Sequence, residues 1–275
     1  MAISKADFDY IAQLTRSESA IVLEAGKEYL VESRLTPIAE QQGFGSLGAF
    51  IDKMRSTSAL NGIHHLTIDA LTTNETSFFR DFHPFESLRK EILPRIIEKR
   101  AAAKQLTIWS AACSTGQEPY TLAMLIQENF PQLADWKITI LATDLSPTVL
   151  KVARLGHYSQ FEVNRGLPAS YLIKYFSKKE DRWHISPKLK QNIQFTSMNL
   201  IQPWPILPPF DLVFIRNVMI YFDVETKKLI LNRIRNCLLP HGYLFLGGSE
   251  TTLNLDPKYQ PVVFGRTVAY EIART

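Results

Sequence analysis

Apolar and polar positions follow a helical period in the first part of the chain. Phe8, Ile11 and Leu14 have the spacing of one helix face, and a second helical pattern runs through KEYLVESRLTPIAEQQG to Gly43. A third helix is predicted to begin in SLGAFIDKM, with the hydroxyl of Ser46 as its N-cap. The pattern therefore predicts that residues 1 to about 70 are helical.

The pattern changes after residue 100, where strand-like apolar runs alternate with helical segments. The runs are LTIWSAA, ITILATD, IQFTSMN, FDLVFIRN and GYLFLGG, and helical patterns such as YTLAMLIQENF and ETKKLILNRIRNCLL lie between several of them. Such alternation predicts an α/β domain with a doubly wound, mainly parallel sheet. The last segment, VVFGRTVAYEIA, is expected to form a terminal hairpin, and Lys99 to Gln105 to finish a helix before the first strand.

Composition narrows the class of protein. The chain has 275 residues and is 45% hydrophobic, which allows one large domain or two smaller ones with a real core. No apolar run is long enough to span a bilayer, and MAISKADFDY lacks the apolar core of a signal peptide. Cys113 and Cys237 make no disulfide framework, so a reduced, cytoplasmic protein is expected.

The chain is mildly basic, with a formal net charge of +4, which suits an acidic partner. It contains no dense Lys/Arg tract and no aromatic RNA-binding motif, so nucleic acid is not expected as the partner.

Ligands of an open parallel sheet bind outside the carboxyl ends of its strands. The first strand ends in ACSTGQ, whose small side chains let a ligand lie against the backbone, but the pattern is not the G-x-G-x-x-G of dinucleotide-binding proteins. Glu118 follows at the start of the next helix, where a carboxylate can simply complement the helix dipole. Because it would also repel a phosphate and attract an ammonium or sulfonium group, the favoured ligand is S-adenosylmethionine.

Polar residues also end the later strands. Asp144 ends the second strand and is placed to accept both ribose hydroxyls of an adenosine, since Ser146 already provides a helix cap. After the third strand, Asn199 has the amide needed for an adenine edge and Leu200 can pack on the ring, although Asn is common in loops. After the fourth strand come Arg216, Asn217 and, within reach of the same rim, Tyr221. A charged residue directly after a buried strand is costly unless satisfied, which favours a site role for Arg216.

Six segments, in chain order, resemble the signature blocks of the chemotaxis receptor methyltransferase family, CheR. They are LTTNETSFFRD, WSAACSTGQEPYTLAML, ATDLSPTVLKVARLGHY, TSMNL, IRNVMIYFD and GYLFLGGSE, and the likeness covers nearly the whole chain. The resemblance implies a helical receptor-recognition domain at 1–72, a linker and connecting helix at 73–98, and a class I, Rossmann-like methyltransferase domain at 99–275. A small antiparallel β-subdomain is implied at about 172–196.

The implied activity is transfer of a methyl group from S-adenosylmethionine to glutamate side chains of bacterial chemoreceptors. The family's cofactor residues fall on Asn74, Thr76, Arg80, Glu118, Asp144, Asn199, Leu200, Arg216 and Asn217. By resemblance, the segment with Asn74 and Thr76 folds over the cofactor. A lone arginine such as Arg80 is usually a solvated helix residue, but its place in the family motif TSFFR favours a role in the site.

An acceptor glutamate is already ionised at pH 7, with an ordinary pKa of about 4.3, so the reaction needs neither a general base nor a metal. We expect Arg80 or Tyr221 to orient that carboxylate, since a guanidinium can pair with it in bidentate fashion. The six histidines are scattered, and His64 and His65 should point different ways on a helix. Cys113 is interpreted as a small buried thiol and not as a nucleophile.

The expected partner is the acidic, helical cytoplasmic part of a chemoreceptor. Lys27, Arg34, Lys53 and Arg55 form a candidate basic stripe, for which a merely solvated face is an equal alternative. The resemblance favours recognition by this domain, with Arg34 as the best candidate.

The hairpin at Ser177 to Asp181 departs from part of the family. Members that dock onto a C-terminal pentapeptide tether of the receptor carry a slightly longer hairpin that contains glycine, and this one is short and has none. The departure predicts an enzyme that works independently of the tether.

Three rival functions share some of these residues. A methyltransferase with another substrate would share every cofactor residue. A non-catalytic S-adenosylmethionine sensor would keep Glu118 and Asp144 without an acceptor site, and Arg80 and Tyr221 argue against it. A nicotinamide oxidoreductase is disfavoured by Glu118 and by the missing glycine pattern.

Overall fold

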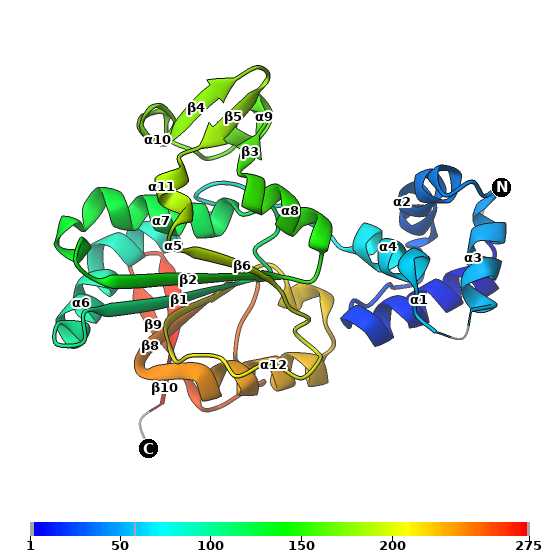
Figure 1. Cartoon of the computed structure of the whole chain (residues 1–275). Helices are drawn as coiled ribbons and strands as arrows, with labels where there is room; N and C mark the ends of the chain where they lie inside the picture. Colours follow the sequence, from blue (N-terminus) through cyan, green and yellow to red (C-terminus); the bar gives the residue numbers. More distant parts are fainter. Residues whose placement is uncertain (1–2, 58, 274–275) are drawn as a thin grey trace. The chain divides into compact units, whose positions relative to one another are not determined.

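The computed structural model describes residues 3–57 and 59–273 (Figure 1). The chain divides into two compact units. The first comprises the chain up to Thr73 together with Tyr221–Thr226, and the second comprises Asn74–Ile220 and the chain from Lys227 onward. Each unit has its own apolar core. Among the described residues, no helix is long and apolar enough to cross a membrane.

The first unit is helical, as the periodicity predicts. Its helices are α1 (Lys5–Ser19), α2 (Glu28–Gln41), α3 (Leu47–Arg55) and α4 (Gly62–Leu71). Ser46 caps α3 as expected, because its hydroxyl accepts a hydrogen bond from the backbone N–H of Ala49 at 3.1 Å. His64 is buried and His65 is exposed, so the two imidazoles do point different ways. The core of this unit includes Phe8, Ile11 and Leu14, the residues whose spacing predicted α1.

The second unit is built on a seven-stranded sheet with strand order β6-β2-β1-β7-β8-β10-β9. The strands are β1 (Gln105–Ala111), β2 (Lys137–Asp144), β6 (Ile193–Ser197), β7 (Phe210–Ile215), β8 (Leu238–Leu246), β9 (Tyr259–Phe264) and β10 (Thr267–Ile272). The first five in the spatial order are parallel, and β10 runs antiparallel to both β8 and β9. The predicted parallel sheet with a C-terminal antiparallel hairpin is confirmed.

Helices cover both faces of this sheet, which explains why its strands are apolar almost throughout. Helices α7 (Gln117–Asn129) and α8 (Pro147–Leu155) lie on one face, and α12 (Val224–Cys237) lies on the other (Figure 1). Before the sheet come α5 (His83–Ser87), a π-helical turn (Leu88–Ile92) and α6 (Leu93–Arg100). Short 3-10 turns occur at Pro131–Leu133 and Met219–Tyr221.

Two predicted boundaries differ from the structure. Helix α6 ends at Arg100, and the next residues form a turn in which Lys104 has a φ of +47°, so Lys99 to Gln105 is mostly not helical. The small subdomain begins before residue 172, because its three-stranded sheet includes β3 (His157–Tyr158) beside β5 (Arg182–Ile185) and β4 (Phe176–Lys179). A two-residue strand has no alternation to detect. The last residues of the predicted range belong to β6 of the large sheet.

Short helices complete the small subdomain. They are α9 (Gln160–Asn164), α10 (Ala169–Tyr175) and α11 (Pro187–Lys190). Lys179 pairs with Arg182 across the β4–β5 hairpin, so its turn consists of Glu180 and Asp181. Glu180 takes a φ of +52°, a conformation that glycine adopts more easily.

Candidate functional site

The loop after β1 turns sharply at the carboxyl edge of the sheet. Ala112, Ser114 and Gly116 all have positive φ values, of +56°, +50° and +94°. At Gly116 a Cβ atom would lie 2.9 Å from the Cβ of Ala153, so this position requires glycine for space as well as for conformation. The other two left-handed residues carry side chains at an energetic cost of the kind found at functional sites.

Asp144 joins this loop to the end of β2. Its carboxylate accepts hydrogen bonds from the backbone N–H groups of Ser114 at 2.8 Å and Ser146 at 3.0 Å, and the residue is buried. Ser146 caps α8 through the N–H of Val149, as expected. The carboxylate therefore lies at the rim where it was predicted to accept the ribose hydroxyls, and that role stays a prediction.

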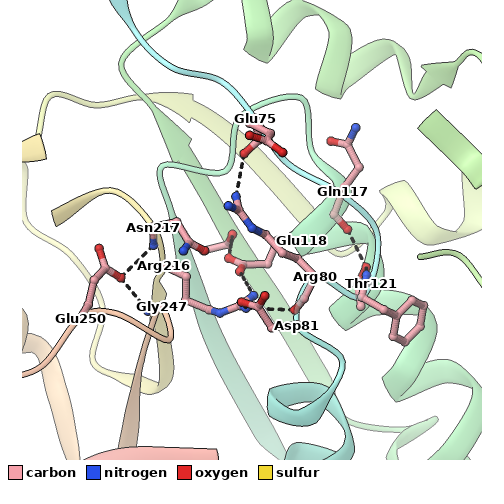
Figure 2. A network of polar contacts seen from close by, with 12 residues as sticks. Glu75, Arg80, Asp81, Gln117, Glu118, Thr121, Arg216, Asn217, Gly247 and Glu250 are labelled. Atoms are coloured by element: carbon pink, nitrogen blue, oxygen red, sulfur yellow. Dashed lines mark hydrogen bonds and ion pairs between the residues drawn. The ribbon is translucent and has the colours of Figure 1, made fainter. Parts of the chain in front are cut away.

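Arg216 is the charged centre of the site (Figure 2). Its side chain is only 2% exposed, and its guanidinium lies between two carboxylates, 2.6 Å from Asp81 and 3.1 Å from Glu118. It also donates to the backbone carbonyl of Arg80 at 2.9 Å and lies 5.5 Å from the ring centroid of Phe85. A buried cation is tolerated only when it is paired and hydrogen-bonded, and the two terminal nitrogens of Arg216 meet that requirement.

Glu118 is engaged by the protein itself. One carboxylate oxygen accepts the hydroxyl of Ser110 at 2.7 Å and the other pairs with Arg216. The prediction brought Glu118 and Arg216 to the same rim, and it treated Glu118 as the partner of a cationic ligand without expecting this ion pair. A cationic ligand would therefore bind to a carboxylate that is already hydrogen-bonded to Ser110 and paired with Arg216.

Two buried polar atoms of this network lack a hydrogen-bond partner within the described residues, namely Nε of Arg216 and Oδ1 of Asn217. A buried unsatisfied donor or acceptor costs about 1–3 kcal/mol, so such a pair at a strand end is typical of a ligand site. One atom donates and the other accepts. The methionine end of S-adenosylmethionine has a carboxylate and an ammonium group, so this pair of atoms fits it.

The segment Asn74–Phe82, which we name the strap, is fastened to the same edge. The carbonyl of Asn74 accepts the hydroxyl of Ser114 at 2.8 Å, and the N–H of Phe79 donates to the hydroxyl of Thr121 at 3.1 Å. Thr76 lies half-buried within the strap. The carbonyl of Asn74 therefore contacts the loop after β1, and the predicted folding of this segment over the cofactor stays a prediction.

The strap carries Arg80 in a turn and not on a helix. The guanidinium of Arg80 donates to the carbonyl of Glu75 at 2.8 Å. Phe79, Asp81 and Phe82 have φ values of +50°, +66° and +48°, so left-handed residues surround Arg80. Strain of this kind persists only where the surrounding contacts enforce it.

An exposed ion pair also holds the strap, since Glu75 lies 2.8 Å from Arg165. The hydrogen bond and charge of Arg165 lower the pKa of Glu75, with a smaller contribution from Arg80. Just beyond, Gly166 has a φ of +82°, and a Cβ atom there would lie 2.1 Å from the carbonyl oxygen of Phe78. The strap thus packs against backbone that has no room for a side chain.

Asn199 and Leu200 have structural roles at the end of β6. The side chain of Asn199 accepts from the N–H of Ile201 at 3.1 Å, the usual Asn turn. Leu200 is buried, and its carbonyl accepts from Trp204 and Arg233, both at 3.1 Å. Their predicted contacts with adenine stay predictions.

Tyr221 belongs to the segment Tyr221–Thr226 of the first unit, and its carbonyl accepts from the N–H of Val22 at 3.0 Å. Its predicted role in orienting the acceptor carboxylate stays a prediction.

Arg34 has a structural role that the sequence did not reveal. Its guanidinium donates to the carbonyls of Ala70, Leu71 and Thr72 at 3.3, 3.0 and 2.8 Å, at the end of α4. Cationic side chains often satisfy the last carbonyls of a helix in this way. A second member of the basic stripe, Arg55, pairs with Asp7 at 2.7 Å and with Asp52 at 3.4 Å. Receptor recognition by Arg34 therefore stays a prediction. The Arg34 side chain already has hydrogen-bond partners within its own domain.

Cys113 is buried, and burial raises the pKa of its thiol well above the usual range, with Asp144 and Glu118 adding to the shift. This agrees with an inert thiol. Across residues 3–57 and 59–273, no group of three or more His, Cys, Asp or Glu side chains is arranged to hold a metal ion.

Several site residues escaped the sequence analysis, namely Asp81, Ser110, Ser114 and Glu250. Two of them gave a usable signal. Ser110 is a polar residue near the carboxyl end of β1, and it is fully buried. Glu250 follows the end of β8 closely, as Asp144 ends β2, so the criterion that found Asp144 also applies to it.

A mainly parallel sheet with an antiparallel C-terminal hairpin and a polar rim at its carboxyl edge is the architecture of a class I S-adenosylmethionine-dependent methyltransferase. Residues 74–267 match the CheR methyltransferase, SAM binding domain, and residues 6–72 match the CheR methyltransferase, all-alpha domain. The chain therefore belongs to the CheR methyltransferase family, and the predicted family and cofactor are confirmed.

Three relatives match this chain over nearly their whole length. Chemotaxis protein methyltransferase 1 of Pseudomonas aeruginosa is 42% identical over 275 residues, which cover 98% of this chain and 99% of the relative. Chemotaxis protein methyltransferase Cher2 of Pseudomonas putida is 40% identical, with the same coverage. The chemotaxis protein methyltransferase of Vibrio parahaemolyticus is 35% identical, over 99% of this chain and 98% of the relative. The enzyme is thus a chemotaxis protein methyltransferase that uses S-adenosylmethionine.

The network around Arg216 gives a first prediction. Glu118→Gln keeps the shape of the side chain but removes the charge beside a buried guanidinium. We expect it to lower the free energy of unfolding by about 2–3 kcal/mol and to weaken S-adenosylmethionine binding about tenfold or more. Urea unfolding and calorimetric titration measure the two effects.

Glu91→Gln is the matched control. Glu91 also pairs with an arginine, Arg95, at 3.9 Å, but both side chains are about half exposed. This change should alter stability by less than about 0.5 kcal/mol. Equal effects of the two substitutions would contradict the importance of the buried pair.

Proposed function

We propose that this methyltransferase forms methyl esters on glutamate side chains of bacterial chemoreceptors, and that it acts in the cytoplasm on their helical signalling bundle. The observation that carries the proposal is the full-length match to chemotaxis protein methyltransferases, which includes the all-α domain as well as the catalytic domain. A methyltransferase for an unrelated small acceptor would have no need of that first domain.

The proposed chemistry needs no general base. When bound, S-adenosylmethionine supplies an electrophilic methyl group on a sulfonium centre. A glutamate carboxylate is a sufficient nucleophile at pH 7, because its ordinary pKa is about 4.3. The opposite charges of the two reactants cancel in the transition state, so a site that excludes water and aligns them supplies the acceleration.

We assign the methionine end of the cofactor to the network around Arg216. The buried atoms without partners, Nε of Arg216 and Oδ1 of Asn217, support this assignment. Asp144 is the proposed acceptor for the ribose hydroxyls, and Asn199 with Leu200 the proposed adenine site. The strap, with Asn74, Thr76 and Arg80, is proposed to cover the cofactor.

We assign the acceptor carboxylate to Arg80, and Tyr221 is the alternative residue for this role. Among the described residues, the guanidinium of Arg80 hydrogen-bonds only to the carbonyl of Glu75, which uses one of its five N–H groups. The neighbouring cation, Arg216, is already paired with Asp81 and Glu118. Arg80 is therefore better suited than Arg216 to receive a second carboxylate.

The experiment that tests this function measures the product's stability in alkali. The protein is incubated with methyl-labelled S-adenosylmethionine and cytoplasmic receptor fragments from the same cell, and the product is treated with mild alkali. We expect labelled, volatile methanol, because a carboxyl methyl ester hydrolyses under these conditions. Label that resists alkali would indicate another acceptor class. Cofactor binding without label would favour a sensor.

The role of Arg80 predicts a large effect on turnover. Arg80→Ala should lower kcat about 100-fold, since the acceptor carboxylate loses its alignment, and the protein should remain folded. The exposed Arg89 offers a matched control, and Arg89→Ala should turn over like the unchanged enzyme. Steady-state kinetics on the receptor fragment provides the measurement. Unchanged turnover of Arg80→Ala would remove this residue from the acceptor site.

The enzyme's independence of a receptor tether remains part of the proposal. It is supported by the two-residue turn of the β4–β5 hairpin, where Glu180 occupies the left-handed position. Such a hairpin lacks the longer, glycine-containing loop of the tether-dependent members of the family.

Calorimetry with a receptor-tail peptide tests this independence. We expect no saturable heat when a C-terminal pentapeptide of aromatic and acidic residues is titrated into the protein. A tether-dependent family member, titrated with the same peptide, shows that the assay detects binding. Tight, saturable binding to the present protein would overturn the proposal for the tether and leave the ester chemistry unaffected.

A further inference from the structure

Glu250 follows β8 in a tight turn, and its carboxylate accepts four backbone N–H groups. One oxygen accepts from Val218 at 3.0 Å and Ile220 at 3.3 Å, and the other accepts from Asn217 at 2.8 Å and Gly247 at 2.6 Å. Figure 2 shows two of these bonds, to the loop after β7 and to the end of β8. A single side chain thus joins the ends of two neighbouring strands.

The loop after β7 depends on this carboxylate for its hydrogen bonds. The N–H groups of Asn217, Val218 and Ile220 all point to Glu250, and Asn217 has a φ of +59°. Successive N–H groups that converge on one anion form a concave binding site of the kind that holds phosphates in other proteins. Here the chain supplies the anion itself.

The charge of Glu250 is balanced by these amides alone. Among the described residues, no Lys, Arg or His side chain forms an ion pair with it. Hydrogen bonds from N–H groups to a carboxylate are stronger than those to a neutral oxygen. A glutamine at this position would have the same shape but would offer one oxygen and an NH2 group, which cannot accept from the remaining N–H groups.

At Gly247, the loop after β7 lies in close contact with the turn after β8. A Cβ atom at this position would lie 2.6 Å from a carboxylate oxygen of Glu250 and 2.8 Å from the backbone nitrogen of Asn217. Both distances are shorter than real Cβ contacts, so the loop after β7 packs directly on the end of β8. The close approach involves the same atoms as two of the four hydrogen bonds, so both describe one constraint on the loop.

The loop that Glu250 holds carries the centre of the cofactor site. Arg216 directly precedes it, and Asn217 is its first residue. These two residues provide the buried donor and acceptor that lack partners. A shift of the loop would move both atoms together.

We propose that Glu250 is a positioning residue, whose carboxylate sets the loop Asn217–Ile220 and so holds Arg216 and Asn217 in the geometry that binds S-adenosylmethionine. Glu250 contacts neither reactant in this proposal. The inference rests on the proposed function, since it takes from there the assignment of Arg216 and Asn217 to the methionine end of the cofactor.

The test compares Glu250→Gln with Glu98→Gln, a matched change at an exposed position of α6. Calorimetry measures the dissociation constant for S-adenosylhomocysteine, and kinetics measures kcat and the two KM values. For Glu250→Gln we expect cofactor affinity to fall roughly 10- to 100-fold, with a higher KM for S-adenosylmethionine and an unchanged KM for the receptor fragment. Glu98→Gln should match the unchanged enzyme in every constant.

This pattern separates positioning from loss of folded protein. A merely structural defect lowers the active fraction, and so kcat, but leaves both KM values and the dissociation constant of the folded molecules unchanged. Cofactor binding of folded Glu250→Gln within twofold of Glu98→Gln would overturn the proposal.

Gly247→Ala provides a second variant in case Glu250→Gln does not fold. It keeps the carboxylate but crowds the loop, so it should raise the same dissociation constant and the same KM. Normal cofactor binding by Gly247→Ala would then count against the proposal. If the unchanged enzyme itself failed to bind S-adenosylhomocysteine, the cofactor assignments would fall, and this inference with them. Failure of the unchanged enzyme to bind would thus contradict the cofactor assignments, whereas normal binding by every variant would contradict only the role of Glu250.

Discussion

The site depends on one buried cation. The guanidinium of Arg216, at the end of β7, pairs with Glu118 on α7 and with Asp81 on the strap. A charge with 2% side-chain exposure has no water to stabilise it, so these partners must remain in place for the fold to be stable. The requirement joins three segments that are distant in sequence, and the place where they meet is the carboxyl edge of the sheet.

Carboxylates also organise the loops on either side of Arg216. Asp144 accepts N–H groups from the loops after β1 and β2, and Glu250 accepts them from the loop after β7 and the end of β8. Loops at strand ends have no ladder partners for their N–H groups, and an acidic side chain satisfies several at once. The carboxylates at this rim thus stabilise the loops, and Asp144 is also the proposed acceptor for the ligand's ribose hydroxyls. The two roles are compatible because both require rigid loops.

The strap shows how the site is held under strain. Left-handed residues occur on both sides of Arg80, and the Arg80 carbonyl itself accepts a hydrogen bond from Arg216. Such backbone is unfavourable in isolation, so it is maintained by the ion pairs and by the packing of Phe78 and Phe79 in the core. The same contacts therefore hold both the proposed acceptor residue and the proposed cofactor residues in place.

The sequence by itself determined the helical first unit, the parallel sheet with its C-terminal hairpin and the polar strand ends at Glu118, Asp144, Arg216 and Asn217. These features follow from local periodicity and from the rule that ligands bind at the carboxyl ends of strands. Only the tertiary structure decided which partners these side chains have. Arg216 is 98 residues from Glu118 and 135 residues from Asp81, and Arg34 reaches carbonyls at the end of another helix. Contacts of this kind depend on how distant segments cross in space, and no local pattern of apolar and polar residues encodes that crossing.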